Sequence, residues 1–511
     1  MKSSPGEITH AVAGVRTDTL TESVLLLLGM AILQRVVGFV REMFFCGWLE
    51  PKQLGEWNVA YGFFLIAAPI AVLGLPGSFG RYLEYYRQQG QLRAILRRTG
   101  IVCGVLALAA MTTVGLFGSW FSNLIFGRPD RTDVVLIMAA VLLAVIAYNF
   151  LTEMLTALRM FRIVSVLQFL NSSVFAILGI GLLIGWQKSV SSVVVAFGGA
   201  CLLGGIIGIT WLRKTWKSLP ADTHPLEHRQ LWDKLLPYAA WMWVGNLLFN
   251  LFETADRYML VHCSRFNEDE ALVAVGNYHS SRVVPLLLLT VATMLGGMIT
   301  PHLSHDWEAG RRGAVSHRLN LTLKILGLGL FAASVAIMLA GPLLFGVILR
   351  GKYDGGLVVL PWTLAYCNWL GLAVVAQNYL WCAEKARLSS LAFLIGLLVN
   401  VGLNLVLVPQ HGLLGAVWAT AAAKLVAMSL IFLFSKKLGH TLDHSVWLIA
   451  LLPVALGGGL WVALTALGGI VIAAFYRNLI FNTVERDEIK TAFGRYAAKW
   501  PLGKSRVPAG T

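Results

Sequence analysis

The stretch from Gln34 to Glu42 reads QRVVGFVRE and lies inside an apolar run long enough to cross a bilayer. It places two arginines and a glutamate in the middle and outer half of that run. A charged side chain at mid-membrane costs roughly 2.5–3.5 kcal/mol on insertion scales, so an intramembrane arginine indicates a substrate or coupling site. At helical spacing, Arg35 and Glu42 share one face while Gln34 and Arg41 share another. The alternative is that Arg41 and Glu42 lie near the outer interface and extend toward water.

The composition of the whole chain places this stretch in a membrane protein. Of 511 residues, 57% are hydrophobic and 13% charged, against about 25% charged in ordinary globular domains. Apolar runs of about 20 residues recur with short connections between them, which predicts an all-α polytopic membrane protein. The net charge of +15 sits in the short loops, where it orients a membrane protein, so we expect no nucleic-acid partner.

The apolar runs predict about fourteen transmembrane helices in two pseudo-symmetric six-helix lobes plus a C-terminal hairpin. The predicted organisation is a cytoplasmic tail at 1–22, an N-lobe with spans 1–6 at 23–212, a cytoplasmic linker at 213–234, a C-lobe with spans 7–12 at 235–434, a short hairpin with spans 13–14 at 446–482, and a basic cytoplasmic tail at 483–511. The spans of the lobes are expected at 23–46, 57–81, 100–125, 134–157, 163–186, 190–212, 235–262, 274–300, 319–348, 357–382, 388–408 and 413–434.

The C-terminal hairpin is short, with Gly457 to Gly459 as its turn, and a single span at 446–482 is the alternative. Beyond it, Ile489, Phe493 and Trp500 fall on one helical face beside lysines and arginines. That pattern is typical of a helix lying on an anionic membrane surface, although a solvated tail would carry the same residues.

Lysine and arginine are distributed unequally between alternate loops. The side that bears the N-terminus holds 26 of them outside the spans, and the opposite side holds 7. Positive residues accumulate on the cytoplasmic side of membrane proteins, so the N-terminus and the basic loops are predicted to be cytoplasmic.

A weak internal repeat relates the two lobes. Gly55-Glu56-Trp57 opens span 2, and Gly276-Asn277-Tyr278 opens span 8 at an offset of 221 residues. Arg162 and Arg387, which open the span 5–6 and span 11–12 pairs, are 225 residues apart. Because six spans is an even number, the halves would have the same orientation, as in transporters that alternate access by rocking two lobes about a central site.

Span 7 carries a polar stripe of Asn246, Asn250, Glu253 and Arg257, with Asp256 to one side. Such a stripe faces protein or water and not lipid. For the asparagines, substrate contact and helix-to-helix hydrogen bonding are both open. For the charges, the alternative to function is that Glu253 and Arg257, four residues apart, neutralise each other.

Other cations occur inside spans of the C-lobe. Arg282 lies in span 8 and Lys424 in the middle of span 12, while Lys324 near the inner end of span 9 is expected to extend toward water. Cations buried in both lobes suit an anionic passenger whose phosphates need neutralisation. Glu253, Asp256 and Glu42 are acidic candidates for coupling to H+ or Na+.

Motifs for bond chemistry are not found in the sequence. It contains no glycine-rich phosphate loop, nucleophile elbow or metal-ligand spacing, and its six cysteines are scattered among the spans. We therefore predict no catalytic residues, no metal and no cofactor, and a protein that is not an enzyme.

Four stretches resemble the multidrug/oligosaccharidyl-lipid/polysaccharide exporter superfamily. LNLVLVPQHGLLGAVWAT (Leu403 to Thr420) and ADRYML (Ala255 to Leu260) are similar to spans 11–12 and span 7 of polysaccharide flippases. QRVVGFVRE and SRVVPL (Ser281 to Leu286) instead resemble spans 1 and 8 of lipid II flippases. On that likeness Arg35, Arg41 and Arg282 match arginines of the cationic cavity in the lipid II branch. The chain departs from that branch after span 2, where it reads GLPGSFG.

The resemblance and the residues together predict a flippase of the bacterial inner membrane. It would move an undecaprenyl-diphosphate-linked oligosaccharide or polysaccharide repeat unit by alternating access, with Arg35, Arg41, Arg282, Lys424, Arg257, Asn246 and Asn250 contacting the substrate. Expected partners are membrane lipids and, in the same pathway, a glycan polymerase and glycosyltransferases. The alternatives are a lipid II flippase of peptidoglycan synthesis, a cation-coupled multidrug exporter, and an integral-membrane glycan polymerase or ligase.

Overall fold

The structure is a computed structural model that describes residues 20–219, 222, 228–476 and 479–499, and within these ranges every regular element is a helix. The first half contains α1 (Leu20–Trp48), α2 (Pro51–Ala71), η2 (Leu75–Ser78), α3 (Phe79–Gln88), α4 (Leu92–Leu116), α5 (Gly118–Phe126), α6 (Thr132–Ala157), α7 (Phe161–Gly185), α8 (Val190–Ser218) and α9 (His228–Cys263). The second half contains α10 (Glu268–Val283), α11 (Pro285–Glu308), α12 (Arg312–Leu343), η3 (Leu344–Ile348), α13 (Asp354–Cys382), α14 (Ala386–Lys437), α15 (His444–Leu451), α16 (Val454–Gly457), α17 (Leu460–Tyr476) and α18 (Thr483–Lys499).

The prediction of an all-α polytopic membrane protein is confirmed. Among the described residues, 10 helices are long and apolar enough to cross a membrane, and two shorter apolar helices follow at His444–Gly457 and Leu460–Ala474. The number of spans, fourteen, stays a prediction, as do the predicted lobe and tail boundaries. Most of the N-terminal tail and the end of the C-terminal tail, including Trp500, lie outside the described residues.

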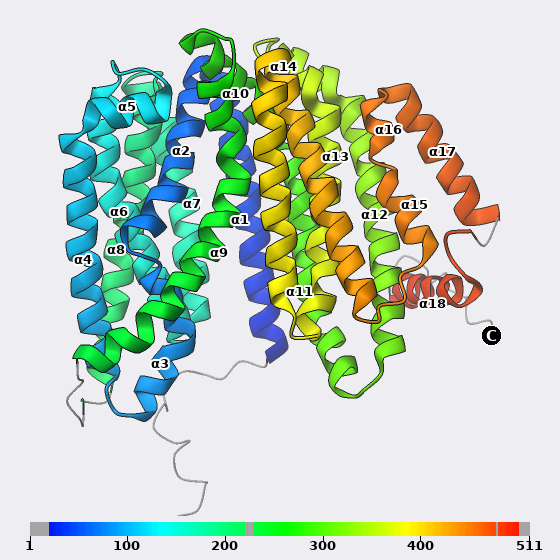
Figure 1. Ribbon diagram of the computed structural model, residues 1–511, viewed down its shortest axis with the longest axis horizontal. Helices are drawn as coiled ribbons and strands as arrows, with labels where there is room; N and C mark the ends of the chain where they lie inside the picture. The colour runs from blue at the N-terminus through cyan, green and yellow to red at the C-terminus, as the bar shows by residue number, and fades with distance from the viewer. Residues whose placement is uncertain (1–19, 220–221, 223–227, 477–478, 500–511) are drawn as a thin grey trace, which may run out of the picture. The chain divides into compact units, whose positions relative to one another are not determined.

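Two predicted spans end or break elsewhere than expected, one near a glycine and one at a proline. Span 2 was expected to continue to residue 81, but α2 ends at Ala71 before Gly74, whose φ of 64° is left-handed. Span 8 was expected as one helix, but it divides into α10 and α11 at Pro285, which has no N–H to continue the ladder. Spans 11 and 12 form the two arms of α14, which folds back at Gly412 with φ 55° and ψ −125° (Figure 1).

The helices form two compact units. Among the described residues, the first comprises those within 20–45, 67–118 and 132–243, and the second those within 46–66, 119–131 and 244–499. In the first unit α6 packs against α4 and α8, and α7 packs against α8. In the second unit α13 is the central helix and packs against α10, α11, α12 and α14. α13 is accordingly buried over most of its surface.

Within the second unit, α2 and α10 cross at two glycines. A Cβ on Gly55 would overlap the carbonyl oxygen of Leu272, and a Cβ on Gly276 would overlap the carbonyl oxygen of Pro51. Asn58 contacts His279 beside this crossing, at a separation of 221 residues. Asn58 and His279 are equivalent positions of the sequence repeat, and the two glycine contacts are equivalent to each other, since Leu272 lies 221 residues after Pro51. The glycines are required because the two backbones touch.

The last four helices follow α14 in the second unit. α15 and α16 are separated by a turn at Leu452 and Pro453, and the chain turns again at Gly458 and Gly459, where Gly459 has φ 90°. α18 runs across the direction of α12 and α17 in Figure 1. The C-terminal helix predicted from the sequence is therefore present as α18.

Candidate functional site

A cluster of three buried cations lies inside the second unit. Arg257 on α9, Arg282 on α10 and Lys424 on the second arm of α14 are 8%, 5% and 3% exposed. Glu253 on α9 lies between two of them. Its Oε2 accepts from Arg282 Nη2 at 2.9 Å, and its Oε1 accepts from Lys424 Nζ at 2.6 Å. We call these four residues the cationic cluster; it holds three positive charges and one negative charge.

The two arginines of the cationic cluster retain hydrogen-bonding capacity. Within the described part of the chain, Nε and Nη1 of Arg257 and Nε and Nη1 of Arg282 are buried and have no hydrogen-bond partner. A buried N–H without an acceptor costs about 1–3 kcal/mol, and more when the group is charged. Guanidinium groups with free N–H bonds in a low-dielectric site are suited to bind phosphate or carboxylate oxygens.

Tertiary packing decides how Glu253 is paired. Glu253 and Arg257 are four residues apart on α9, and mutual neutralisation was one of two interpretations of the sequence. The hydrogen bonds of Glu253 instead go to Arg282 and Lys424, on two other helices. The aromatic ring of Phe252 also covers Lys424, with the ammonium 3.6 Å from the ring centroid.

The hydrogen bonds to Asp256 come from neutral donors, and we call this group the Asp256 cluster. It borders the cationic cluster, because the guanidinium of Arg282 lies 5.3 Å from the ring centroid of Tyr278. Its Oδ2 accepts from Thr420 Oγ1 at 2.6 Å and from Tyr278 Oη at 3.0 Å, and its Oδ1 accepts from Asn404 Nδ2 at 3.0 Å. Asn400 joins the cluster through Asn404 and Thr420. The carboxylate is 2% exposed. The sequence had suggested Asp256 but gave no role to Tyr278 or Thr420.

The two asparagines of the span 7 stripe contact each other. Asn250 lies about one turn, and Asn246 about two turns, before Glu253 on α9. Asn250 Nδ2 donates to Asn246 Oδ1 at 2.9 Å and to the carbonyl oxygen of Leu65 at 3.0 Å. Asn250 is half-buried and Asn246 is exposed. The contact with Leu65 is helix-to-helix hydrogen bonding, which was one of the two roles considered for these amides.

Arg35, Arg41 and Glu42 belong to the first unit. Arg41 Nη2 donates to Glu42 Oε1 at 2.7 Å, and its guanidinium lies 4.2 Å from the ring centroid of Phe175 on α7. Both Arg41 and Glu42 are mostly buried, and Arg35 is exposed. That Arg35 and Arg41 act on the same substrate as the cationic cluster stays a prediction.

A second network of charged residues was not predicted from the sequence. Glu56 on α2 is 1% exposed and is bound by Arg128, at 3.3 Å, and by Arg131. Arg128 Nη1 and Lys52 Nζ also contact Asp269 Oδ1, at 2.9 Å and 2.7 Å. The hydrogen bond from Lys52 lowers the pKa of Asp269. Glu56 had been noted in the sequence as part of the Gly55-Glu56-Trp57 repeat element. Arg128 and Arg131 had entered only the count of lysines and arginines in the loops.

Lys324 was predicted to extend toward water, and this prediction is wrong. Lys324 on α12 is 2% exposed, and its Nζ contacts Glu485 at 2.7 Å and Asp443 at 2.6 Å. Glu485 is completely buried at the start of α18. A buried acid on a neighbouring helix therefore holds the ammonium inside the protein.

Comparison with known sequences identifies a family over more than half of the chain. The model of a family described as "Polysaccharide biosynthesis protein" matches residues 20–305. The lipid II flippase MurJ of Bacillus subtilis is 21% identical over 444 residues, which are 79% of this chain and 80% of that protein. The uncharacterized membrane protein YabM of the same organism is 28% identical over 227 residues, 43% of this chain and 41% of that protein.

Solved structures of two kinds of transporter share the fold. A lipid II flippase MurJ in an inward closed conformation superposes with a TM-score of 0.67 at 15% identity, over 89% of this chain and 100% of that chain. A multidrug resistance MATE family transporter of the MOP superfamily, in an inward-facing conformation, gives 0.63 at 13% identity, over 80% and 96%. The resemblance predicted from the sequence motifs is therefore confirmed.

Proposed function

Because this chain belongs to the polysaccharide biosynthesis protein family, within the multidrug/oligosaccharidyl-lipid/polysaccharide exporter superfamily, we propose that it is a flippase for an undecaprenyl-diphosphate-linked oligosaccharide or polysaccharide repeat unit. The lipid would pass from the cytoplasmic to the outer leaflet of a bacterial inner membrane by alternating access, with the N-terminus in the cytoplasm. No bond is made or broken in this step.

The observation that supports this substrate is the unequal charge of the cationic cluster. Two of the three buried cations share the hydrogen bonds of one carboxylate, and four guanidinium nitrogens of Arg257 and Arg282 have no partner among the described residues. A diphosphate offers several acceptor oxygens on adjacent phosphorus atoms, which match the fork of a guanidinium. Uncharged sugars do not neutralise these charges, so we assign the cluster to the diphosphate.

Glu253 supplies the step that makes binding reversible. It occupies the space between Arg282 and Lys424 and holds both by short hydrogen bonds. An entering diphosphate would replace the carboxylate at these two cations, and Glu253 would return when the lipid leaves. Competition from Glu253 weakens the binding of the diphosphate. A carrier needs this weakening, because a substrate held too tightly is not released.

The Asp256 cluster is our candidate for the coupling ion, H+ or Na+. Asp256 receives its hydrogen bonds from Thr420, Tyr278 and Asn404, and Asn404 Oδ1 is buried and has no partner among the described residues. Carboxylate, amide and hydroxyl oxygens are suited to a hard cation, and the same carboxylate is our candidate carrier if the coupling ion is a proton.

A lipid II flippase is the second candidate. It is supported by the sequence relative and the solved structure that carry this name, and by the first-span and SRVVPL motifs. Lipid II is also a diphosphate-linked glycan, so the role of the cationic cluster would be unchanged. The two candidates differ in the sugar, which the polar groups outside the cluster would recognise.

The test is a flipping assay with the purified protein in liposomes. A fluorescent undecaprenyl-diphosphate oligosaccharide is bleached from one side, and the rate at which protected lipid becomes accessible is measured. We expect Arg282→Ala to lower the rate at least about tenfold, since a lost hydrogen bond between charged groups is worth about 1.5–3 kcal/mol. Lys436→Ala, an exposed cation at the end of α14, is the matched control. A normal rate for Arg282→Ala would exclude the cationic cluster from transport.

A further inference from the structure

The C-terminal helix α18 is anchored to α12 by buried charge. Glu485 in the first turn of α18 receives Lys324 Nζ through both carboxylate oxygens, at 2.7 Å and 2.9 Å. Glu485 also forms a reciprocal capping box with Asn482, at 2.8 Å and 2.9 Å. One turn further, Glu488 meets His317 of α12. The beginning of α18 is therefore held in a fixed place beside α12.

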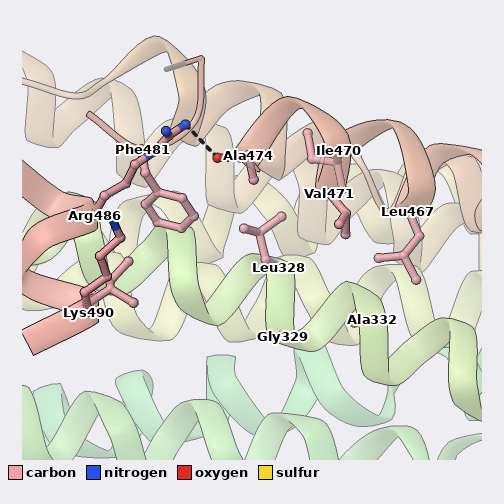
Figure 2. A pocket seen from close by; sticks show the side chains of 11 residues that line it. Leu328, Gly329, Ala332, Leu467, Ile470, Val471, Ala474, Phe481, Arg486 and Lys490 are labelled. Atoms are coloured by element: carbon pink, nitrogen blue, oxygen red, sulfur yellow. Dashed lines mark hydrogen bonds between the residues drawn. The ribbon is translucent and has the colours of Figure 1, made fainter. Parts of the chain in front are cut away.

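This anchoring encloses an apolar groove between α12, α17 and α18. Figure 2 shows the groove, whose volume is about 560 Å³, within the range typical of small-molecule sites. Gly329 on α12 widens it, because a Cβ there would meet nothing within 4 Å. Side chains from the three helices form its apolar walls: Leu328, Ala332, Leu467, Ile470, Val471 and Ile489.

Two cations of α18 mark one end of the groove. Arg486 and Lys490 are four residues apart on the same face of the helix, and Figure 2 places both at the end opposite Leu467. Arg486 Nη2 donates to the carbonyl oxygen of Ala474 at 2.8 Å, and Lys490 is exposed. The groove is thus apolar along its length and positively charged at one end.

We propose that this groove binds one anionic glycerophospholipid of the surrounding membrane, with an acyl chain along α17 and the phosphate at Arg486 and Lys490. The wall from Leu467 to Ala474 is about 10 Å long at 1.5 Å per residue, which fits part of one acyl chain. Cations beside a membrane surface attract anionic headgroups, whereas a zwitterionic lipid gains little from them. The proposal needs only the membrane location of the chain and does not depend on what the protein transports.

The site is tested by native mass spectrometry of the full chain in detergent. Phosphatidylglycerol and phosphatidylcholine with identical acyl chains are titrated separately, and the first lipid-bound state is quantified. We expect phosphatidylglycerol to bind about twenty-fold more tightly, since each lysine or arginine near a headgroup contributes roughly a fivefold preference. Equal affinity for the two lipids would overturn the proposal. So would tighter binding of undecaprenyl phosphate than of phosphatidylglycerol, because the groove would then belong to a polyprenyl lipid.

Matched variants separate the headgroup contact from the acyl contact. Lys490→Gln, and more strongly Arg486→Gln with Lys490→Gln, should reduce the preference for phosphatidylglycerol and leave phosphatidylcholine binding unchanged. Lys436→Gln with Lys437→Gln removes the same charge from exposed residues of α14 and should retain the preference. Gly329→Leu should weaken binding of both lipids, whereas Gly402→Leu, also at a glycine with open space, should not. Equal effects within either pair would refute a specific site.

Discussion

At the scale of single residues, our proposal gives Glu253 two opposing roles, because it would compete with the substrate and it also stabilises the protein. We expect Glu253→Gln to lower the melting temperature of the protein without ligand, because Arg282 and Lys424 lose their shared carboxylate, and breaking a buried ion pair costs about 3–5 kcal/mol. Undecaprenyl diphosphate should then raise the melting temperature more in Glu253→Gln than in the wild type, since it replaces the lost charge.

The control for this measurement is Glu308→Gln, which neutralises an exposed acid at the end of α11. It should leave both melting temperatures near those of the wild type. If undecaprenyl diphosphate stabilises Glu253→Gln no more than the wild type, then the carboxylate does not compete with the diphosphate.

Arg35 gives a second prediction at this scale. It is an exposed cation within an apolar helix, and we expect Arg35→Ala to abolish complementation of polysaccharide or cell-wall assembly in cells that lack the native protein. The amount of protein in the membrane fraction should be unchanged, because the side chain stabilises no buried ion pair among the described residues. Normal complementation would remove Arg35 from the transport site.

Residues of the candidate site could be predicted from the sequence only where a charge interrupts an apolar span. Arg257, Arg282, Lys424 and Glu253 carry that signal, and their proximity in the second unit agrees with it. Their pairing could not be predicted, because it depends on which helices are neighbours. Lys324 was misassigned for the same reason: Glu485, its partner, is 161 residues away in the chain.

At the scale of helices, the crossing of α2 and α10 depends on glycines. We expect Gly55→Ala and Gly276→Ala each to destabilise the protein by about 1–3 kcal/mol, the usual cost of overpacking, because the added methyl group meets a backbone carbonyl that cannot move aside. The check is the melting temperature of the purified protein in detergent. Gly402→Ala, at a helical glycine with open space, should instead be neutral or stabilising.

Helices were easier to predict than their breaks. An apolar run of about 20 residues determines a membrane span almost alone, because an unpaired backbone in lipid is too costly. The division at Pro285 could not be fixed from the run itself, since prolines are tolerated inside other helices here, such as α12 and α13. The turn at Gly412 lies between the predicted spans 388–408 and 413–434, as expected.

At the scale of the whole molecule, the charge asymmetry of the loops predicts the orientation. Single cysteines introduced at Lys188, in the loop before α8, and at Glu308, at the end of α11, lie on opposite predicted sides of the membrane. A membrane-impermeant maleimide should label Lys188→Cys in intact cells and Glu308→Cys only after permeabilisation. The reverse pattern would place the N-terminus outside and contradict the direction of transport that we propose.

The internal repeat that relates the two halves of the chain was predicted from short motifs alone, at offsets of 221 and 225 residues. The contact of Asn58 with His279, at a separation of 221 residues, now supports the first offset physically. The contact of Gly55 with Leu272 and that of Gly276 with Pro51 support it as a reciprocal pair. The sequence could not show that equivalent positions touch, because an offset states that two segments are alike and says nothing about their distance.

The contact between α2 and α10 at Gly55 and Gly276 also limits how one helix can be placed against the other. On each helix the glycine lies four residues, about 6 Å, from the carbonyl that contacts the glycine of the other helix. The junction of α2 and α10 therefore has two contacts whose spacing is fixed. Sliding either helix along the other would bring a backbone carbonyl against a residue that carries a Cβ. The junction consequently fixes the register of α2 against α10 at both contacts.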